Sequence, residues 1–265
     1  MKFKHYKIRT KLSNLPYPLV ACLALFFVIT RLIIRKKIIL IMTPGKVGSS
    51  SLYYSLLRKT NFCVFHIHYI SKIRILKEFN LERDSSKGGA SWHLYVSYWI
   101  NLFIKWFKFK YKLILLVRKG SSRYLSSVFQ NLNQMPKNVF NQKTGFINYP
   151  ELKKTILNGV NEDITNINDY IKFELGYFKI NDNELKINET FAAKGGDDVE
   201  ILYTTLFQTD PLLYINSFLG TKINRLERAN VGKDKFYSEE YKEMKKDIEL
   251  ITSPKYYALD SKLGF

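Results

Sequence analysis

Two groups of polar residues in this chain have the types and the spacing needed to hold an anion. The first group lies in Thr43-Pro44-Gly45-Lys46-Val47-Gly48 and in the serines that follow it. Backbone N–H groups at the start of a helix bind phosphate or sulfate esters, and a lysine charge and serine hydroxyls strengthen such a site. The candidate anion contacts are Gly45, Lys46, Gly48, Ser49, Ser50 and Ser51.

The second group consists of Arg118 and Ser126, with Arg123 between them. An arginine can fork onto two oxygens of a phosphate, and a serine hydroxyl can donate a further hydrogen bond. This group is therefore a candidate for holding a second phosphate of the same ligand.

The same local pattern must position both groups: an apolar run, a turn of small residues and then a helix. The runs Ile38–Met42 and Leu113–Val117 predict buried strands, and apolar residues recur at helical spacing after each turn. A Walker A loop has its lysine after the second glycine, whereas Lys46 precedes Gly48, so an ordinary ATPase or kinase loop is disfavoured. Taken alone, the first motif also fits a plain Gly/Ser turn between a strand and a helix.

Two histidines at the end of a predicted strand, residues 62–68, are candidates for a general base. Alternation along a strand puts His66 and His68 on one face, at the edge where open α/β sheets bind ligands. A histidine titrates at about pH 6.5, which suits a base at neutral pH. We favour His68 because it lies nearer the following loop, and His93 is a weaker third candidate. The alternative is that one of the pair is a core histidine.

Together the two units resemble the nucleotide-binding motifs of sulfotransferases that use PAPS (3′-phosphoadenosine 5′-phosphosulfate). The matching features are K-V-G-S-S-S-L from Lys46, H-I-H from His66, and R-x-x-x-x-R-x-x-S-x-x-F-Q-N from Arg118. Over residues 38–132 the chain looks like a bacterial family of capsular polysaccharide synthesis proteins related to carbohydrate sulfotransferases. It departs from the usual R-D-P start of the second motif, because it has Arg118-Lys119-Gly120.

The resemblance implies a role for each candidate residue. Lys46 would stabilise charge on the leaving phosphate, while Arg118 and Ser126 would hold the 3′-phosphate. The implied contacts of the 5′-phosphate are Gly48, Ser49 and Ser50. A later basic loop, residues 226–237, resembles the segment that closes over the nucleotide, with candidate contacts at Asn230, Gly232 and Lys233.

The composition favours an anionic partner. The chain has 265 residues, with 42 Lys and Arg against 23 Asp and Glu, and hence a formal net charge of +19. This charge favours a nucleotide and, as the acceptor, an already anionic glycan, while lipid and small-molecule acceptors stay open. No nucleic-acid-binding motif is recognisable, so we expect no nucleic-acid partner. The only cysteines, Cys22 and Cys63, imply neither a disulfide framework nor a metal site.

The N-terminal region, residues 1–37, predicts a basic segment followed by a membrane anchor. Residues 15–34 are apolar apart from Arg31 and are just long enough to span a bilayer. Basic residues flank this run on both sides, so the orientation of the anchor is left open. The alternative is an extra helix packed on the domain.

For residues 38–265 we expect one α/β domain: a P-loop-like three-layer α/β/α fold around a central parallel sheet, preceded by the hydrophobic helix. The activity that the resemblance implies is transfer of a sulfuryl group from PAPS to a hydroxyl of a carbohydrate or polysaccharide acceptor, without a metal. We expect a fourth strand at 200–205, an acceptor-binding excursion at 133–161 and an exposed charged helix at 238–263. The rival hypotheses are a P-loop-like kinase and a membrane-bound glycan-binding protein without catalysis.

Overall fold

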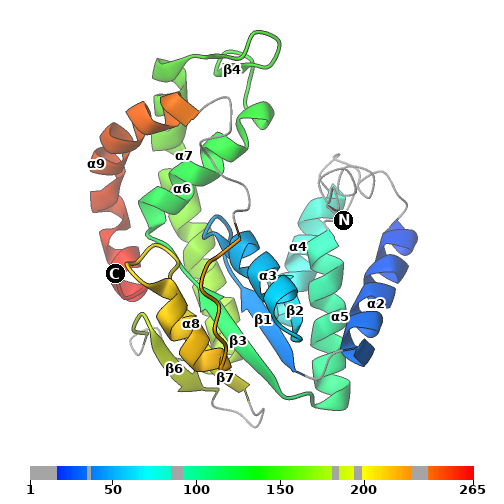
Figure 1. Ribbon diagram of the computed structural model, residues 1–265. Coiled ribbons are helices and arrows are strands. Elements are labelled where there is room, and N and C mark those ends of the chain that lie inside the picture. The colour runs from blue at the N-terminus through cyan, green and yellow to red at the C-terminus, as the bar shows by residue number, and fades with distance from the viewer. Residues whose placement is uncertain (1–16, 35–36, 85–91, 181–184, 194–198, 228–237) are drawn as a thin grey trace.

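The fold is built on a five-stranded sheet. A computed structural model describes residues 17–34, 37–84, 92–180, 185–193, 199–227 and 238–265 (Figure 1). The strand order in the sheet is β2-β1-β3-β7-β6. The strands are β1 (Ile38–Met42), β2 (Cys63–Ile67), β3 (Tyr111–Leu116), β6 (Glu189–Ala192) and β7 (Val199–Thr204).

Four of these strands are parallel, which confirms the expected α/β class with a central, mostly parallel sheet. β1 pairs with β2 and β3, and β3 pairs with β7, all in parallel. The register places Met42 opposite both Ile67 and Leu115. The carboxyl ends of β1, β2 and β3 therefore lie level, at one edge of the sheet.

The helices cover both faces of the sheet because its central strands are apolar throughout. Ile39 and Ile41 point to a core shared with α3 (Ser49–Lys59) and α8 (Pro211–Leu219). Leu40 and Met42 point to a second core on the other face. That core is shared with α2 (Tyr17–Ile34), α5 (Trp92–Phe107), α7 (Tyr149–Tyr170) and α9 (Ser238–Lys262).

The expected membrane anchor finds no support. Helix α2 instead packs along α5, and the indole N–H of Trp99 donates to the Ala21 carbonyl at 3.0 Å. Arg31 donates to a backbone carbonyl of β2 at 2.9 Å. Within the described residues, none of the helices is both long and apolar enough to cross a bilayer. Helix α2 packs on the domain through Val20, Ala24 and Val28, which are buried, while Phe26 and Ile33 are exposed.

The predicted excursion at 133–161 contains regular elements, and the expectation for the last helix needs correction. After the short helix η1 (Leu132–Gln134), β4 (Phe140–Asn141) pairs with β5 (Phe146–Ile147), and α7 begins at Tyr149. Helix α9 is not an exposed charged helix, because it packs against α6 (Gly120–Gln130) and α7. Its buried stripe is Met244, Ile248, Thr252, Tyr256 and Leu259.

Candidate functional site

The loop between β1 and α3 has the sharp backbone turn that the sequence predicts. Gly45, Lys46 and Gly48 all lie in the left-handed region, with φ of 93°, 59° and 80°. A lysine there is uncommon and marks a constrained backbone. The Gly45 N–H donates to the Thr43 hydroxyl at 2.9 Å, which tightens the start of the turn.

The N-terminus of α3 fits an anion. Gly48 is the N-cap, no side chain caps the helix, and its first turn holds no acidic residue. The Ser51 N–H is bonded to the Gly48 carbonyl at 2.9 Å. Ser49 is buried, whereas Ser50 and Ser51 are half-buried at the first turn. The donor set is therefore backbone amides, serine hydroxyls and the positive end of a helix dipole.

Arg118 of the second motif contacts the loop of the first motif. It follows β3 directly, and its Nη1 donates to the Lys46 carbonyl at 3.2 Å. The guanidinium carbon lies 4.2 Å from the centroid of the Phe207 ring, which orients the group by a cation–π contact. Lys46 and Arg118 therefore lie at the same end of the sheet, in the loops that follow the adjacent strands β1 and β3.

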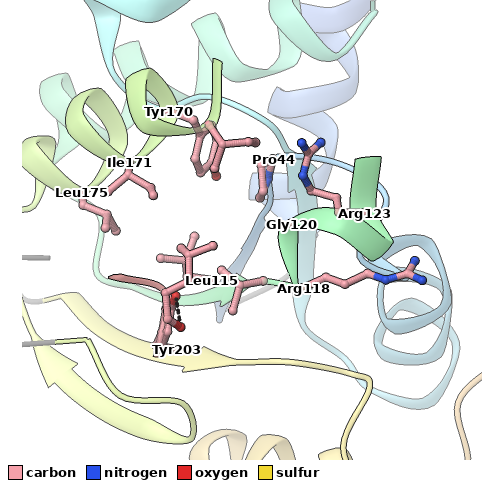
Figure 2. Close-up of a pocket in the computed structure, with 12 residues that line it drawn as sticks. Pro44, Leu115, Arg118, Gly120, Arg123, Tyr170, Ile171, Leu175 and Tyr203 are labelled. Carbon is pink, nitrogen blue, oxygen red and sulfur yellow. Dashed lines mark hydrogen bonds between the residues drawn. The ribbon is translucent and has the colours of Figure 1, made fainter. Parts of the chain in front are cut away.

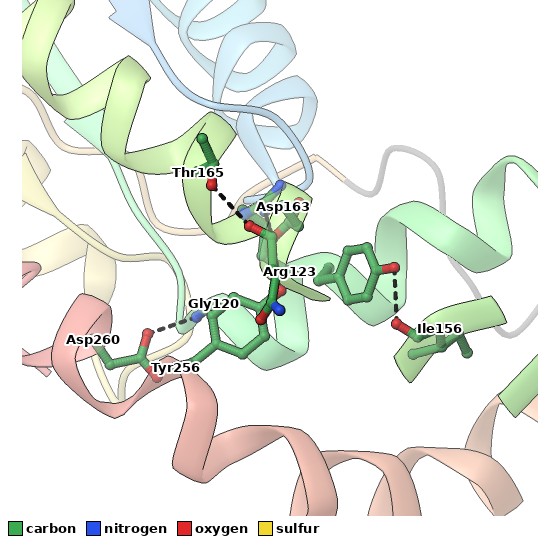
Figure 3. Close-up of polar contacts among 9 residues, drawn as sticks. Gly120, Arg123, Ile156, Asp163, Thr165, Tyr256 and Asp260 are labelled. Carbon is green, nitrogen blue, oxygen red and sulfur yellow. Dashed lines mark hydrogen bonds and ion pairs between the residues drawn. The ribbon is translucent and has the colours of Figure 1, made fainter. Parts of the chain in front are cut away.

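Arg123 has a structural role. Its Nη2 pairs with Asp163 of α7, and the Tyr256 hydroxyl of α9 donates to the same carboxylate at 2.8 Å (Figure 3). Figure 2 shows the Arg118 and Arg123 guanidinium groups pointing in different directions, beside a small, mostly apolar cavity of about 10 Å³. The ion pair and the Tyr256 hydrogen bond link α6, α7 and α9. The Arg123 guanidinium therefore stabilises the packing of these helices.

The departure from R-D-P has a packing reason. Gly120 begins α6, and a Cβ at this position would lie 2.3 Å from the Tyr256 ring. The Gly120 N–H donates to Asp260 Oδ1 of α9 at 2.7 Å. The turn after Arg118 is thus fixed by α9 instead of by a proline. Ser126 lies half-buried in the middle of α6, four residues after Ser122, whose hydroxyl donates to Glu249 of α9.

The candidate histidines lie together at the carboxyl end of β2. The ring centroids of His66 and His68 are 5.1 Å apart, and His93 of α5 lies 5.5 and 5.1 Å from them. His68 Nδ1 is 2.9 Å from the Thr43 carbonyl oxygen. A neutral imidazole bonded to a carbonyl oxygen carries its proton on the bonded nitrogen, which fixes the orientation of the His68 ring.

A polar cleft of about 410 Å³ opens beside the loop, within the usual size range of small-molecule sites. It lies between α4 (Lys72–Asp84) and α7 and reaches Thr43, Pro44 and His68 at the sheet edge. His66 and His93 are not among its lining residues. Of the three histidines, His68 is therefore the one that a ligand in this cleft could contact.

A buried acid that the sequence does not single out holds the loop carrying His68. Glu174 lies in η2 (Ile171–Leu175), a π-helical turn that continues α7, and is fully buried. Its Oε2 accepts the N–H groups of Ile70 and Ser71 at 2.8 and 3.0 Å. Burial raises the pKa of Glu174 from 4.5 to about 7, although the two backbone hydrogen bonds oppose the shift.

This raised pKa predicts a pH-dependent stability. The folded state holds the proton more tightly than the unfolded chain, so Glu174 favours folding below pH 4.5 and loses that contribution as the pH rises to about 7. The shift from 4.5 to about 7 corresponds to about 3 kcal/mol in the free energy of unfolding. In urea unfolding, the free energy of unfolding of the wild type should fall between pH 5 and pH 8, whereas that of Glu174→Gln should not. The stability of the variant relative to the wild type should therefore rise by that order over this pH range. The exposed Glu189→Gln is the control; parallel curves for wild type and Glu174→Gln would contradict the burial effect.

Other acids near the loop were also missed by sequence reasoning. Glu78, Glu162 and Asp163 line the cleft, but they come from α4 and α7, far apart in the sequence. Helical spacing alone links Asp163 to Ile167 and Tyr170, which line the same cleft. Asn230, Gly232 and Lys233 lie outside the described residues. In the described part of the chain, no cluster of His, Cys, Asp and Glu has the geometry of a metal site.

The site therefore combines a sharp turn at the start of α3, a second basic group that follows the adjacent strand, and a histidine that lines a polar cleft. No protein-family model, curated protein or solved structure matches this chain.

Proposed function

We propose that this protein is a PAPS-dependent sulfotransferase with a P-loop-like nucleotide site, acting on a hydroxyl of a carbohydrate. The observation that carries the proposal is the hydrogen bond from Arg118 to the Lys46 carbonyl. It joins the two predicted phosphate-binding units, on adjacent strands, into one site. A ligand with phosphates at two positions, as in PAPS, matches a site with two such units.

Different residues hold the two phosphates of the donor. The first-turn amides of α3 and the hydroxyls of Ser50 and Ser51 hold the 5′-phosphate. Arg118 has further N–H donors beyond the one bonded to Lys46, and these hold the 3′-phosphate, with Ser126 as its second donor. When bound, PAPS supplies an activated sulfuryl group.

Two side chains act on the reacting atoms. The acceptor hydroxyl oxygen bonds to sulfur as the bond from sulfur to the bridging phosphate oxygen breaks. The His68 imidazole takes the hydroxyl proton, and the Lys46 ammonium stabilises the charge left on the bridging oxygen. The products are the sulfate ester and PAP (3′,5′-diphosphoadenosine).

The residues at the strand ends favour this function over a kinase. A P-loop kinase needs an acid at the end of a second strand to hold magnesium. In the described residues, the three positions that follow each of β1, β2, β3 and β7 contain no Asp or Glu.

The proposal predicts selective binding of PAP. PAP should raise the melting temperature because it binds the native state, and ATP with magnesium should do so much less. Arg118→Ala should weaken PAP binding by roughly 10- to 150-fold, as expected for the loss of a charged hydrogen bond. Thermal unfolding of the purified full chain measures the first effect, and isothermal titration measures the second.

Lys119→Ala is the matched control, because it removes a positive charge from the neighbouring, exposed position. It should leave PAP affinity near that of the wild type. Equal stabilisation by PAP and by ATP with magnesium would contradict the proposal and favour a kinase-like site.

A further inference from the structure

The cleft between α4 and α7 has a charge pattern unlike that of the whole chain. Its lining contains three basic side chains, Arg74, Lys77 and Arg123, and three acidic ones, Glu78, Glu162 and Asp163. The lining is therefore balanced, whereas the chain carries a net charge of +19.

The basic groups of the cleft are already paired. Arg74 Nη2 lies 2.9 Å from Glu78, and its Nη1 lies 3.6 Å from Asp169. Lys77 Nζ lies 3.2 Å from Asp169. Arg123 pairs with Asp163, as described above. The Arg74 and Arg123 side chains are largely buried, so breaking either pair would leave an uncompensated charge at high cost.

These pairs disfavour an anionic ligand. A carboxylate or sulfate in the cleft would compete with the acids already paired to Arg74, Lys77 and Arg123, and it would also lie near the carboxylate of Glu162. The ligand groups that suit such a lining are hydroxyls, because a hydroxyl can donate to a carboxylate and accept from a paired cation.

The remaining lining supports the same chemistry. Asn166 offers both donors and an acceptor from its amide, and Tyr69 adds an aromatic ring beside His68. His68 lies at the sheet-edge end of the cleft with its Nδ1 held by Thr43. A hydroxyl of a ligand in the cleft would therefore meet the proposed base.

We infer that this cleft binds an uncharged, hydroxyl-rich saccharide as the acceptor, and not an already anionic glycan. The inference rests on the proposed function, and it reverses the preference for an anionic acceptor that the overall charge implies. In this interpretation, the excess positive charge of the chain acts on the anionic nucleotide and not on the acceptor.

Saccharide binding to the full chain tests the inference. The probes are neutral oligosaccharides of glucose, galactose and N-acetylglucosamine, each compared with the same sugar carrying a carboxylate or a sulfate. Saturation-transfer NMR should show binding of neutral members, with affinities about tenfold or more above those of their anionic counterparts. Asn166→Trp fills the cleft and should abolish this binding.

Thr165→Trp is the matched control. Thr165 is the adjacent exposed residue, and its hydroxyl donates back to Asn161 of its own helix at 3.0 Å. This variant should bind as the wild type does. Stronger binding of the anionic members, no binding of any neutral member, or unchanged binding in Asn166→Trp would each overturn the inference.

The melting temperature with PAP, measured on the same preparations, separates the two proposals. If PAP stabilises the protein while no neutral saccharide binds, the acceptor inference fails and the proposed function stands. If neutral saccharides bind in the cleft while PAP has no effect, the cleft assignment holds and the sulfotransferase proposal fails.

Discussion

Lys46→Ala should lower the turnover of sulfuryl transfer by roughly 100- to 1,000-fold, the range found when one charge-stabilising group is removed from an active site. PAP affinity should change much less, because the ammonium acts on charge that develops in the transition state. Alanine replaces a residue already at a φ of 59°, so the backbone strain at this position is retained. Steady-state kinetics and PAP titration of the same variant give the two numbers.

Two comparisons make this result specific. Lys119→Ala should keep normal turnover, since Lys119 is exposed and lies beyond the strand end. The melting temperature of Lys46→Ala without nucleotide should match that of the wild type. Unchanged turnover in Lys46→Ala would remove its assigned role.

His68→Ala should slow transfer by roughly 100- to 10,000-fold, the usual contribution of a general base. PAP binding should stay near normal, because the hydrogen bond that is lost runs to the Thr43 carbonyl and not to an anion-binding amide. Single-turnover measurements with saturating PAPS isolate the chemical step.

His66→Ala and His93→Ala are close comparators, because both rings pack within 5.5 Å of another member of the cluster and neither lines the cleft. Both variants should keep most of the rate. A full rate in His68→Ala would place the base elsewhere, and the acids that line the cleft, Glu78, Glu162 and Asp163, would then be tested.

The parallel sheet could be predicted from the sequence because its central strands are uninterrupted apolar runs. Strand β6 could not, because its residues 189–192 are mostly exposed and show no apolar alternation. Its pairing with β7 is antiparallel and lies at the edge of the sheet. The burial of α9 was missed because one narrow stripe of apolar residues runs through an otherwise charged segment.

The position of Lys46 and Arg118 at one end of the sheet was predictable, since each follows a recognisable strand. The polar cleft was not, because α4 and α7 come together only in the folded chain and contribute single charges without a motif. Arg123 shows the limit of a motif: its spacing matches a phosphate ligand, yet an acid 40 positions away, Asp163, takes its guanidinium.

The most direct test of the central claim is transfer of label from sulfur-labelled PAPS to saccharide, measured with the purified full chain. We expect a neutral oligosaccharide to become labelled and PAP to accumulate in equal amount. Lys46→Ala and His68→Ala should lose most of this transfer, while Lys119→Ala should retain it. Absence of transfer to every neutral and anionic saccharide tested, with PAPS left intact, would contradict the assignment of this protein as a carbohydrate sulfotransferase.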